Sequence, residues 1–484
     1  MTEEIVLPAP VEPDVLIAGS PEAPNPEDNA VDDAAELKKC VETITRCKLK
    51  EEENFRELVG AIHQLHARKL CPPGFESPTA FLMKKFGYSR SYCLRLASEG
   101  KLLKRLSTRV DTLPLLKSDA HLRLLVALPE EDQDRVLELV KSWAVVAGLN
   151  DWSPKLIESA ITFLRPPTAP PDRRESVEVK LVRKFKGLVD EAKAGLPEKT
   201  EKLILEKFDV LGEKALALGR ARRTTGIDWT EATWNPLQGC TRASAGCDNC
   251  YAAKLMATRR AGAFPGLARA IVKNGKKSYA FMGKIVLLPD HLSDALSDRA
   301  PKRYFVNSMS DLFHPLVPVV FIDAVFSVME KATWHEFQVL TKRPDRMAEY
   351  TSKRYEKAAP PENVWLGTTT EDQETFDERY ADLLKTKAAV RWLSVEPLIG
   401  PIEFASLKDV DWVVVGGETG SDRRMEKGWV ESIRDQCAAA KVAFYFKQWG
   451  DFGEDGMKSK RKPKKDGLVP AATLDGKIYN AYPR

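Results

Sequence analysis

The stretch Trp412-Val413-Val414-Val415-Gly416-Gly417-Glu418 joins a short apolar run to a glycine-rich, acidic end. Five similar apolar runs occur in the same half of the chain, and the segments between them are long enough for helices. This alternation is typical of a mainly parallel sheet that helices bury. We therefore predict an α/β domain over residues 223–455, either an open sheet or an incomplete (β/α)6 barrel. The expected strands cover residues 304–307, 337–340, 364–367, 390–395, 412–415 and 443–446.

Polar residues follow nearly every one of these expected strands. Because the carboxyl ends of parallel strands meet at one edge, the residues just after the strands are where sites are built. The sequence therefore predicts a polar site at that edge. The residues concerned are Asn307-Ser308, Asp311, Thr341-Lys342-Arg343, Thr368-Thr369-Thr370-Glu371, Glu396, Gly416-Gly417-Glu418 and Lys447-Gln448.

Three cysteines, Cys240, Cys247 and Cys250, lie within eleven residues. The spacing of the last two lets both sulfurs face one centre, and Gly239 and Gly246 allow the loop to bring the first back to them. A structural zinc site normally closes a tetrahedron, whereas an iron–sulfur cluster held by three cysteines leaves one iron open. The lack of a nearby fourth ligand therefore favours a [4Fe–4S] cluster as a metal site.

Other interpretations of the three cysteines remain open. A zinc ion could be completed by His291, His314 or His335, since paired cysteines at this spacing often bind zinc. The thiols could also be inert and buried, or form a redox disulfide. These alternatives correspond to two rival functions, a zinc-stabilised nucleic-acid-binding protein without catalysis and a thiol redox protein.

Charge is distributed unevenly along the chain. Residues 1–36 hold ten acids and no Lys or Arg, which predicts a disordered acidic tail. The total of +4 therefore hides a net charge of +14 for residues 37–484. A basic body of this kind favours a polyanionic partner such as nucleic acid, although solubility alone is an equally simple explanation.

Residues 37–170 have the apolar spacing of helices and predict an all-α N-terminal region. Within it, Ser77-Pro78 should begin a helix that Gly87 ends, and Ser89 should cap the next. Two short helices around such a turn outline a helix-turn-helix-like region, which suggests DNA binding. A plain helical bundle with solvated cations is the alternative. The candidate nucleic-acid-binding residues are Arg90, Arg95, Lys101 and Lys104.

The remaining segments complete a multidomain organisation. Residues 171–222 are expected to form linker helices, and residues 456–484 a basic tail with a closing segment. No apolar run is long enough to cross a membrane, and the N-terminus is acidic where a secretory signal would be basic. Eight unevenly spaced cysteines also do not suggest a secreted disulfide framework. We therefore expect a cytoplasmic protein with no membrane partner.

Several sequence blocks, in order along residues 225–449, resemble the phage-encoded three-cysteine-motif family, which is often described as radical-SAM-like and of undetermined activity. The match covers about half the chain. The blocks are Trp234-Asn235-Pro236, Gly239-Cys240, Gly246-Cys247, Cys250-Tyr251-Ala252, residues 307–313, Leu340-Thr341-Lys342-Arg343-Pro344, residues 366–369, Ser394-Val395-Glu396-Pro397-Leu398, residues 416–420 and Phe446-Lys447-Gln448-Trp449-Gly450. Leu474-Asp475-Gly476-Lys477 is similar to the closing segment of that family.

The resemblance implies an incomplete (β/α)6 barrel of radical-SAM type and an enzyme that uses a [4Fe–4S] cluster and S-adenosyl-L-methionine. It also implies a reductant protein as a partner, and nucleic acid is the first substrate to consider. Gly416, Gly417 and Glu418 are similar to the element that holds the methionine amino group in such enzymes, although a simple strand-to-helix turn would look the same. The chain departs from the usual pattern, with six residues between Cys240 and Cys247 and with Asn249 where an aromatic residue is usual.

Overall fold

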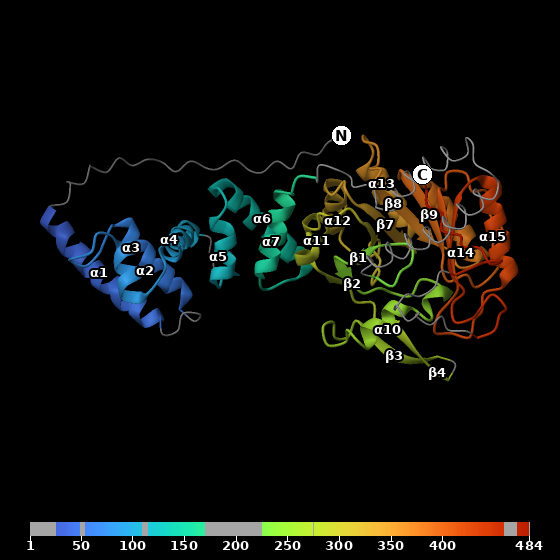
Figure 1. The fold of residues 1–484 in the computed structure, drawn as a ribbon, viewed down its shortest axis with the longest axis horizontal. Coiled ribbons are helices and arrows are strands. Elements are labelled where there is room, and N and C mark those ends of the chain that lie inside the picture. The colour runs from blue at the N-terminus through green and yellow to red at the C-terminus, as the bar shows by residue number, and fades with distance from the viewer. Residues whose placement is uncertain are drawn as a thin grey trace, which may run out of the picture. The chain divides into compact units, whose positions relative to one another are not determined.

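The computed structural model describes residues 26–48, 54–108, 115–169, 225–273, 275–458 and 472–483. It divides into two compact units, Met1–Pro129 and Glu130–Arg484 (Figure 1). The expected linker helices at 171–222, the first 25 residues of the acidic tail and most of the basic tail lie outside the described residues. Among the residues that are described, no helix is long and apolar enough to cross a membrane.

The first unit is helical, as the sequence predicts. Its α-helices are α1 (Pro26–Lys48), α2 (Phe55–Ala67), α3 (Pro78–Phe86), α4 (Arg90–Arg105) and α5 (Asp119–Val126). The expected boundaries of α3 and α4 are confirmed, because Ser77 and Ser89 each accept a hydrogen bond from the first turn and Gly87 ends α3 with a φ of 74°. Gly100 lets α4 approach α2 closely, since a Cβ there would lie 2.2 Å from the Val59 carbonyl oxygen.

Helix α1 begins earlier than the expected end of the acidic tail. Residues 26–36, which the sequence assigns to the tail, form the first half of this helix. Pro26 and the acids that follow it suit a helix N-terminus, because proline presets φ and carboxylates favour the positive end of the helix dipole. The second half is anchored by the buried side chains of Cys40, Ile44 and Cys47.

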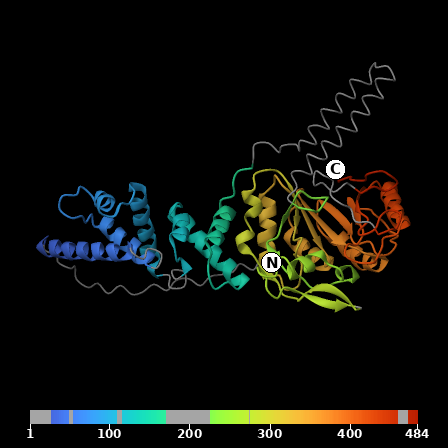
Figure 2. The ribbon, with the colours of Figure 1, turned by 60° about the horizontal axis from the view of Figure 1, so that its bottom comes forward.

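The second unit is built on a curled, entirely parallel seven-stranded sheet, which is seen from two directions in Figures 1 and 2. The strands lie in the order β1-β6-β7-β8-β9-β10-β11. All six expected strands are present, but the expected count is one too low, because β1 joins the edge beside β6. The bounds are β1 (Ala232–Trp234), β6 (Arg303–Val306), β7 (Glu336–Thr341), β8 (Val364–Thr369), β9 (Val390–Val395), β10 (Trp412–Gly416) and β11 (Ala443–Gln448).

Aromatic side chains fill one face of this sheet. Trp392 and Trp412 are fully buried and lie with Trp229 in a cluster that takes residues from five of the strands. Gly367 on β8 makes room for it, since a Cβ at that position would lie 2.5 Å from the Trp392 ring. The helices between the strands are α12 (Val319–Lys331), α13 (Pro344–Arg354), α14 (Gln373–Lys385) and α15 (Lys427–Ala440).

Two helices that the sequence groups with the N-terminal region belong to the second unit. They are α6 (Glu130–Ala147) and α7 (Pro154–Leu164). The buried Ser159 on α7 donates a hydrogen bond to the Pro289 carbonyl (3.0 Å) and accepts one from the Ser293 amide (3.1 Å). These bonds join α7 to the short helices η4 (Pro289–His291) and α11 (Asp294–Ser297) of the β/α body.

A small subdomain projects from the segment between β1 and β6 (Figure 2). It contains α10 (Tyr251–Ala257) and the antiparallel hairpin of β3 (Ala268–Lys273) and β4 (Lys276–Phe281), while β2 (Leu237–Gln238) pairs with β5 (Val286–Leu287) nearby. At the other edge, the closing segment packs on β11, where Phe446 and Tyr479 are joined by a 2.8 Å backbone hydrogen bond.

Candidate functional site

A cavity of about 520 Å³ lies at the carboxyl ends of the strands. Its volume is within the range of small-molecule sites. The expected polar edge is therefore present, and Cys240, Cys247 and Cys250 all line the same cavity. The polar residues that the six longer strands contribute to its wall include Asn307, Ser308, Asp311, Thr341, Lys342, Arg343, Thr369, Glu396, Gly417, Glu418, Lys447 and Gln448.

The cysteine loop leaves β2 through Gly239, whose φ of 98° is accessible mainly to glycine. It then forms a short 3-10 turn, η3 (Ala245–Cys247), and ends where Cys250 begins α10. The Cys247 sulfur accepts a hydrogen bond from the Ala243 amide (3.4 Å). Amide groups directed at cysteine sulfurs are among the contacts that tune iron–sulfur sites.

Two thiols of this loop, those of Cys240 and Cys250, are not activated as nucleophiles. Burial raises the pKa of Cys240 to about 12, the nearby Asp311 adds to this effect, and Arg343 opposes it. Burial also raises the pKa of Cys250. Reactive redox cysteines need a lowered pKa, whereas a bound metal displaces the proton of a coordinating thiol. All eight cysteines are free thiols. These features count against the thiol redox interpretation.

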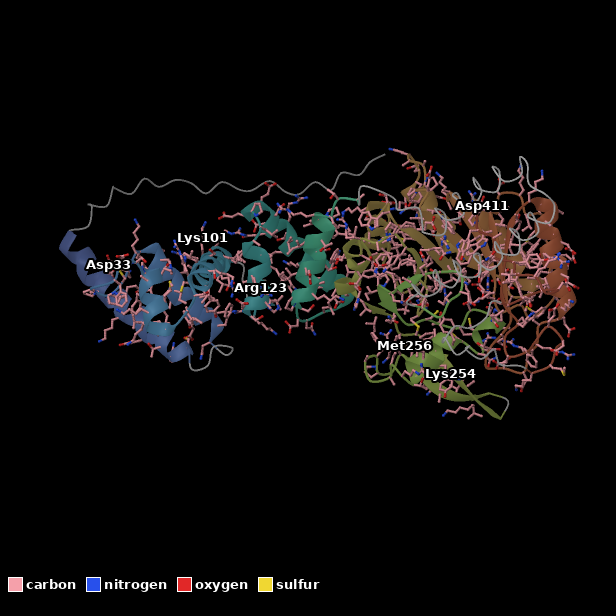
Figure 3. The ribbon with its side chains drawn as sticks, viewed as in Figure 1. Asp33, Lys101, Arg123, Lys254, Met256 and Asp411 are labelled. Atoms are coloured by element: carbon pink, nitrogen blue, oxygen red, sulfur yellow. The ribbon has the colours of Figure 1, made fainter. Side chains whose placement is uncertain are left out.

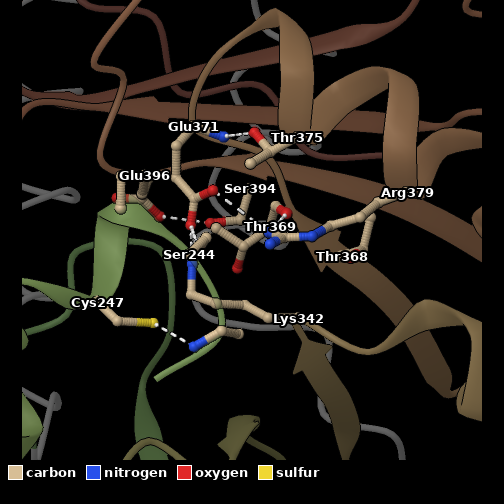
Figure 4. A network of polar contacts seen from close by, with 12 residues as sticks. Ser244, Cys247, Lys342, Thr368, Thr369, Glu371, Thr375, Arg379, Ser394 and Glu396 are labelled. Atoms are coloured by element: carbon tan, nitrogen blue, oxygen red, sulfur yellow. Dashed lines mark hydrogen bonds and ion pairs between the residues drawn. The ribbon is translucent and has the colours of Figure 1, made fainter. Parts of the chain in front are cut away.

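A buried network of polar contacts supports the cysteine loop (Figure 4). The carboxylate of Glu371 is fully buried and accepts hydrogen bonds from Ser244 (2.7 Å), from Lys342 and from Arg379 (3.3 Å). Gly246 packs directly on this carboxylate, since a Cβ there would lie 2.5 Å from Oε1 of Glu371. The single negative charge of Glu371 thus faces the two positive charges of Lys342 and Arg379. The net positive charge of this group would stabilise thiolates on the cysteine loop.

A second ion pair holds the first part of the loop. Asp311 accepts a hydrogen bond from Arg343 (2.6 Å), and Arg343 donates in turn to the Thr241 hydroxyl (2.7 Å). Both side chains are largely buried, and charge-assisted contacts of this kind are the stronger class of hydrogen bond. The loop is therefore fixed from two neighbouring strands, β7 and β8.

Of the expected cofactor element, Gly417 and Glu418 line the cavity and Gly416 does not, and the structure engages each of the three residues in other contacts. Both oxygens of Glu418 accept hydrogen bonds from Arg423, which also donates to the Ala245 carbonyl of the cysteine loop (3.0 Å). A Cβ on Gly417 would lie 2.3 Å from the Trp449 carbonyl oxygen, and one on Gly416 would lie 2.8 Å from Glu396. The pairing of Arg423 with Glu418 was not predicted from the sequence.

Asn307 is the most unusual residue of the cavity wall. Its side chain is 2% exposed, and neither its amide nitrogen nor its oxygen has a hydrogen-bond partner among the residues that the structure describes. Its φ of 62° is left-handed, a conformation that asparagine tolerates. An unsatisfied buried amide costs about 1 to 3 kcal/mol, and such groups are rare in folded proteins. The sequence placed Asn307 at the polar edge but did not single it out.

The three thiols of the cysteine loop are the candidate ligands of a metal centre. Within the described ranges, no three His, Cys, Asp or Glu side chains are grouped so that they could hold one ion. A single zinc ion requires ligands that converge on one point, whereas an iron–sulfur cluster can bind each cysteine through a different iron. The cluster requires three thiols around one cavity, and Cys240, Cys247 and Cys250 meet that requirement.

The three histidines considered for zinc are engaged elsewhere. Both ring nitrogens of His335 are within hydrogen-bond distance of backbone groups, and His291 contacts Asp294. His314 is the one that reaches the cysteine loop, through the Thr241 hydroxyl at 2.9 Å, and its other ring nitrogen accepts from the Leu316 amide. A histidine could therefore complete a zinc site only if one of its ring nitrogens gave up its present contact and bound the metal instead.

In the first unit, the four cationic residues proposed for DNA binding all lie on α4, but they differ in environment. Arg90, Lys101 and Lys104 are exposed, and Lys101 is labelled in Figure 3. Arg95 instead forms ion pairs with Glu99 and Asp119. Glu99 is fully buried, and burial together with Asp119 raises its pKa to about 7. Arg95 is therefore engaged in a structural contact inside the first unit.

The fold and the site define a helical protein joined to a curled parallel β/α sheet with three thiols at a cavity on its carboxyl edge. The chain belongs to the family described as "Protein of unknown function (DUF5131)", whose model matches residues 224–483. No match was found among curated proteins. A solved structure of spore photoproduct lyase complexed with dinucleoside spore photoproduct is similar at 13% identity, with 46% of this chain and 66% of that chain covered. The TM-score is 0.23, which does not establish a shared fold.

Proposed function

We propose that the protein is a radical-SAM-like iron–sulfur enzyme that acts on nucleic acid, with a [4Fe–4S] cluster on Cys240, Cys247 and Cys250. The observation that carries the proposal is the meeting of the three thiols at one cavity, at the edge of a parallel sheet where sites are built. The resemblance of the sequence to the three-cysteine-motif family is consistent with it.

Different residues of the chain have different roles at this site. The ion pairs through Glu371 and Asp311 hold the cysteine loop, and Lys342 and Arg343 supply positive charge beside the thiolates. Asn307 offers an unpaired amide, which can donate and accept at once, to the polar end of a ligand. Phe305, which belongs to the buried aromatic cluster, also lines the cavity and gives it an apolar surface that excludes water.

When bound, a cluster with an open iron supplies an electron for the cleavage of S-adenosyl-L-methionine, and a reductant protein must restore that electron. We place the methionine end of this cofactor near Gly417 and Glu418, which line the cavity, with Gly416 packed behind them. Since Glu418 pairs with Arg423, an incoming ammonium group would have to share or replace that ion pair.

Anaerobic purification with iron, sulfide and zinc analysis tests the proposal directly. We expect a brown protein that contains iron and acid-labile sulfide and that forms 5′-deoxyadenosine from S-adenosyl-L-methionine after reduction. A colourless protein with one zinc per chain would instead support the zinc-stabilised binding protein. A cluster-containing protein that does not cleave the cofactor would support a binding role without catalysis.

Replacing Asn307 by glycine should weaken the binding of S-adenosyl-L-methionine by about tenfold or more, because the amide partner is lost. Glycine is chosen because it accepts the left-handed φ. The melting temperature should not fall, since the removed amide has no partner within the described part of the chain. Equilibrium dialysis measures the affinity, and Asp409→Gly, at another left-handed position, is the matched control. An unchanged affinity would exclude Asn307 as a ligand-binding residue.

DNA binding by α4 is a second candidate function, favoured by the exposure of Arg90, Lys101 and Lys104 after a three-residue turn. Lys101→Ala combined with Lys104→Ala should reduce the salt dependence of duplex binding by about one unit of slope per lost phosphate contact. Arg90→Ala should change sequence preference instead, because it lies at the start of the helix. Fluorescence anisotropy at several salt concentrations measures both effects. Absence of binding at low salt would leave α4 as a structural helix.

A further inference from the structure

The segment that follows the cysteine loop and precedes β6 has an extreme charge composition. Residues 249–289 contain eight Lys or Arg residues and no Asp or Glu. Solvated surfaces usually mix both signs, so a run of this length with one sign is a feature of polyanion-binding surfaces. The segment forms α10 and the β3–β4 hairpin, which we call the basic hairpin module (residues 251–284).

The cations of the basic hairpin module are presented to solvent. Six of them are exposed, and within the described part of the chain none of the six forms an ion pair with a carboxylate. They are Lys254, Arg259, Arg260, Arg269, Lys277 and Lys284. Figure 3 shows Lys254 on α10, beside the hairpin. Both strands contribute, because Arg269 lies on β3 and Lys277 on β4.

The module is anchored against the cysteine cavity. Ser278 donates a hydrogen bond to the Asp248 carbonyl of the cysteine loop (2.9 Å), and Phe281 packs with Met256 and Met309 in a small apolar cluster. Ile271, Tyr279 and Phe281 also form part of the cavity wall. A molecule held by the cations of the module would therefore lie next to the cavity.

We propose that the basic hairpin module binds the sugar-phosphate backbone of a nucleic acid and presents one of its bases to the cysteine-lined cavity. This inference rests on the proposed function, and it specifies where the substrate docks. Regularly spaced phosphates match cations spread over a helix and two strands. The aromatic rings of Tyr279 and Tyr251 at the cavity offer stacking surfaces for an unpaired base, which is how proteins commonly hold single-stranded or extruded nucleotides.

The test uses the full chain and fluorescein-labelled DNA of about 20 nucleotides, single-stranded and duplex. The basic hairpin variant combines Arg259→Ala, Arg269→Ala and Lys277→Ala. We expect it to reduce the slope of log affinity against log salt by about two to three units, at about 0.7 to 0.9 per phosphate contact. The comparison is made in a chain that also carries Lys101→Ala and Lys104→Ala, so that DNA binding by α4 does not mask the effect.

Two controls separate charge from folding. Lys353→Ala, Lys357→Ala and Lys408→Ala remove the same total charge from exposed positions that precede β8 and β10, at the opposite edge of the sheet, and should leave the slope unchanged. The charge-retaining set Arg259→Lys, Arg269→Lys and Lys277→Arg should keep most of the affinity, since phosphate contacts need charge more than shape. Melting curves check that every variant folds.

Three results would overturn the inference: equal slopes for the basic hairpin variant and the opposite-edge control, absence of binding at low salt, or stronger retention on phosphatidylserine vesicles than on DNA. The metal content of each variant is measured in parallel. If the native chain contains iron but does not bind DNA, the docking surface is refuted and the cluster is not. DNA binding without iron would refute the cluster and leave the docking surface intact.

Discussion

Alanine at Cys250 should remove iron and acid-labile sulfide from the anaerobically purified protein almost completely. The same result is expected for Cys240→Ala and Cys247→Ala, because two remaining thiolates cannot hold a cluster that three are needed to bind. A loss of this size is the largest effect that we expect from any single substitution in the chain. Metal analysis and the visible absorption of the cluster measure it.

Cys437→Ala is the matched control for this series. Cys437 lies on α15, where it is fully buried and burial raises its pKa to about 12, so it resembles Cys240 in environment but does not line the cavity. Its replacement should leave the iron content unchanged. Partial losses of similar size in all four variants would indicate a general folding effect, and zinc in place of iron would contradict the cluster.

Glutamine at Glu371 should destabilise the β/α unit by about 3 to 5 kcal/mol. The substitution removes the negative charge that Lys342 and Arg379 share, and a buried charge without its partner is costly. The cysteine loop should also loosen, because the carboxylate accepts the Ser244 hydroxyl and supports Gly246. Thermal unfolding followed by circular dichroism measures the stability.

Glu349→Gln provides the comparison for Glu371, since Glu349 pairs with Lys353 on the exposed surface of α13. Exposed pairs contribute little to stability because water screens them, so this variant should melt like the native protein. Should Glu371→Gln fail to fold, Ser244→Ala tests the same network, because it removes only one hydrogen bond, about 1 kcal/mol. Equal stability of Glu371→Gln and Glu349→Gln would contradict a supporting role for the buried carboxylate.

Much of the fold can be predicted from local sequence signals. The helix caps at Ser77 and Ser89 and the six longer strands follow from short-range patterns, and the structure contains them all. The seventh strand could not be found in this way. β1 has only three residues, too few for a hydrophobic period, and its parallel pairing with β6 joins Ala232 to Tyr304, far along the chain.

The candidate site divides in a similar way. The spacing of the three cysteines and the polar residues after the strands were visible in the sequence, because each is a local pattern. The contact partners of the polar residues were not visible in the sequence. Glu418 pairs with Arg423, which also donates a hydrogen bond to the Ala245 carbonyl, and Arg95 pairs with Asp119 across 24 residues. Sequence spacing cannot tell a cation that is exposed for binding from one that is already paired.

The available chemical groups follow from the sequence alone: three thiols, a row of polar strand ends and a helical region with cations on one helix. What each group can do depends on its surroundings in the folded chain. The sheet brings loops separated by more than 170 residues to one cavity, so that Arg423 contacts Ala245 while Asn307 has no hydrogen-bond partner in the described ranges. Burial and pairing depend on contacts that are distant along the chain, and these contacts exist only once the sheet has curled.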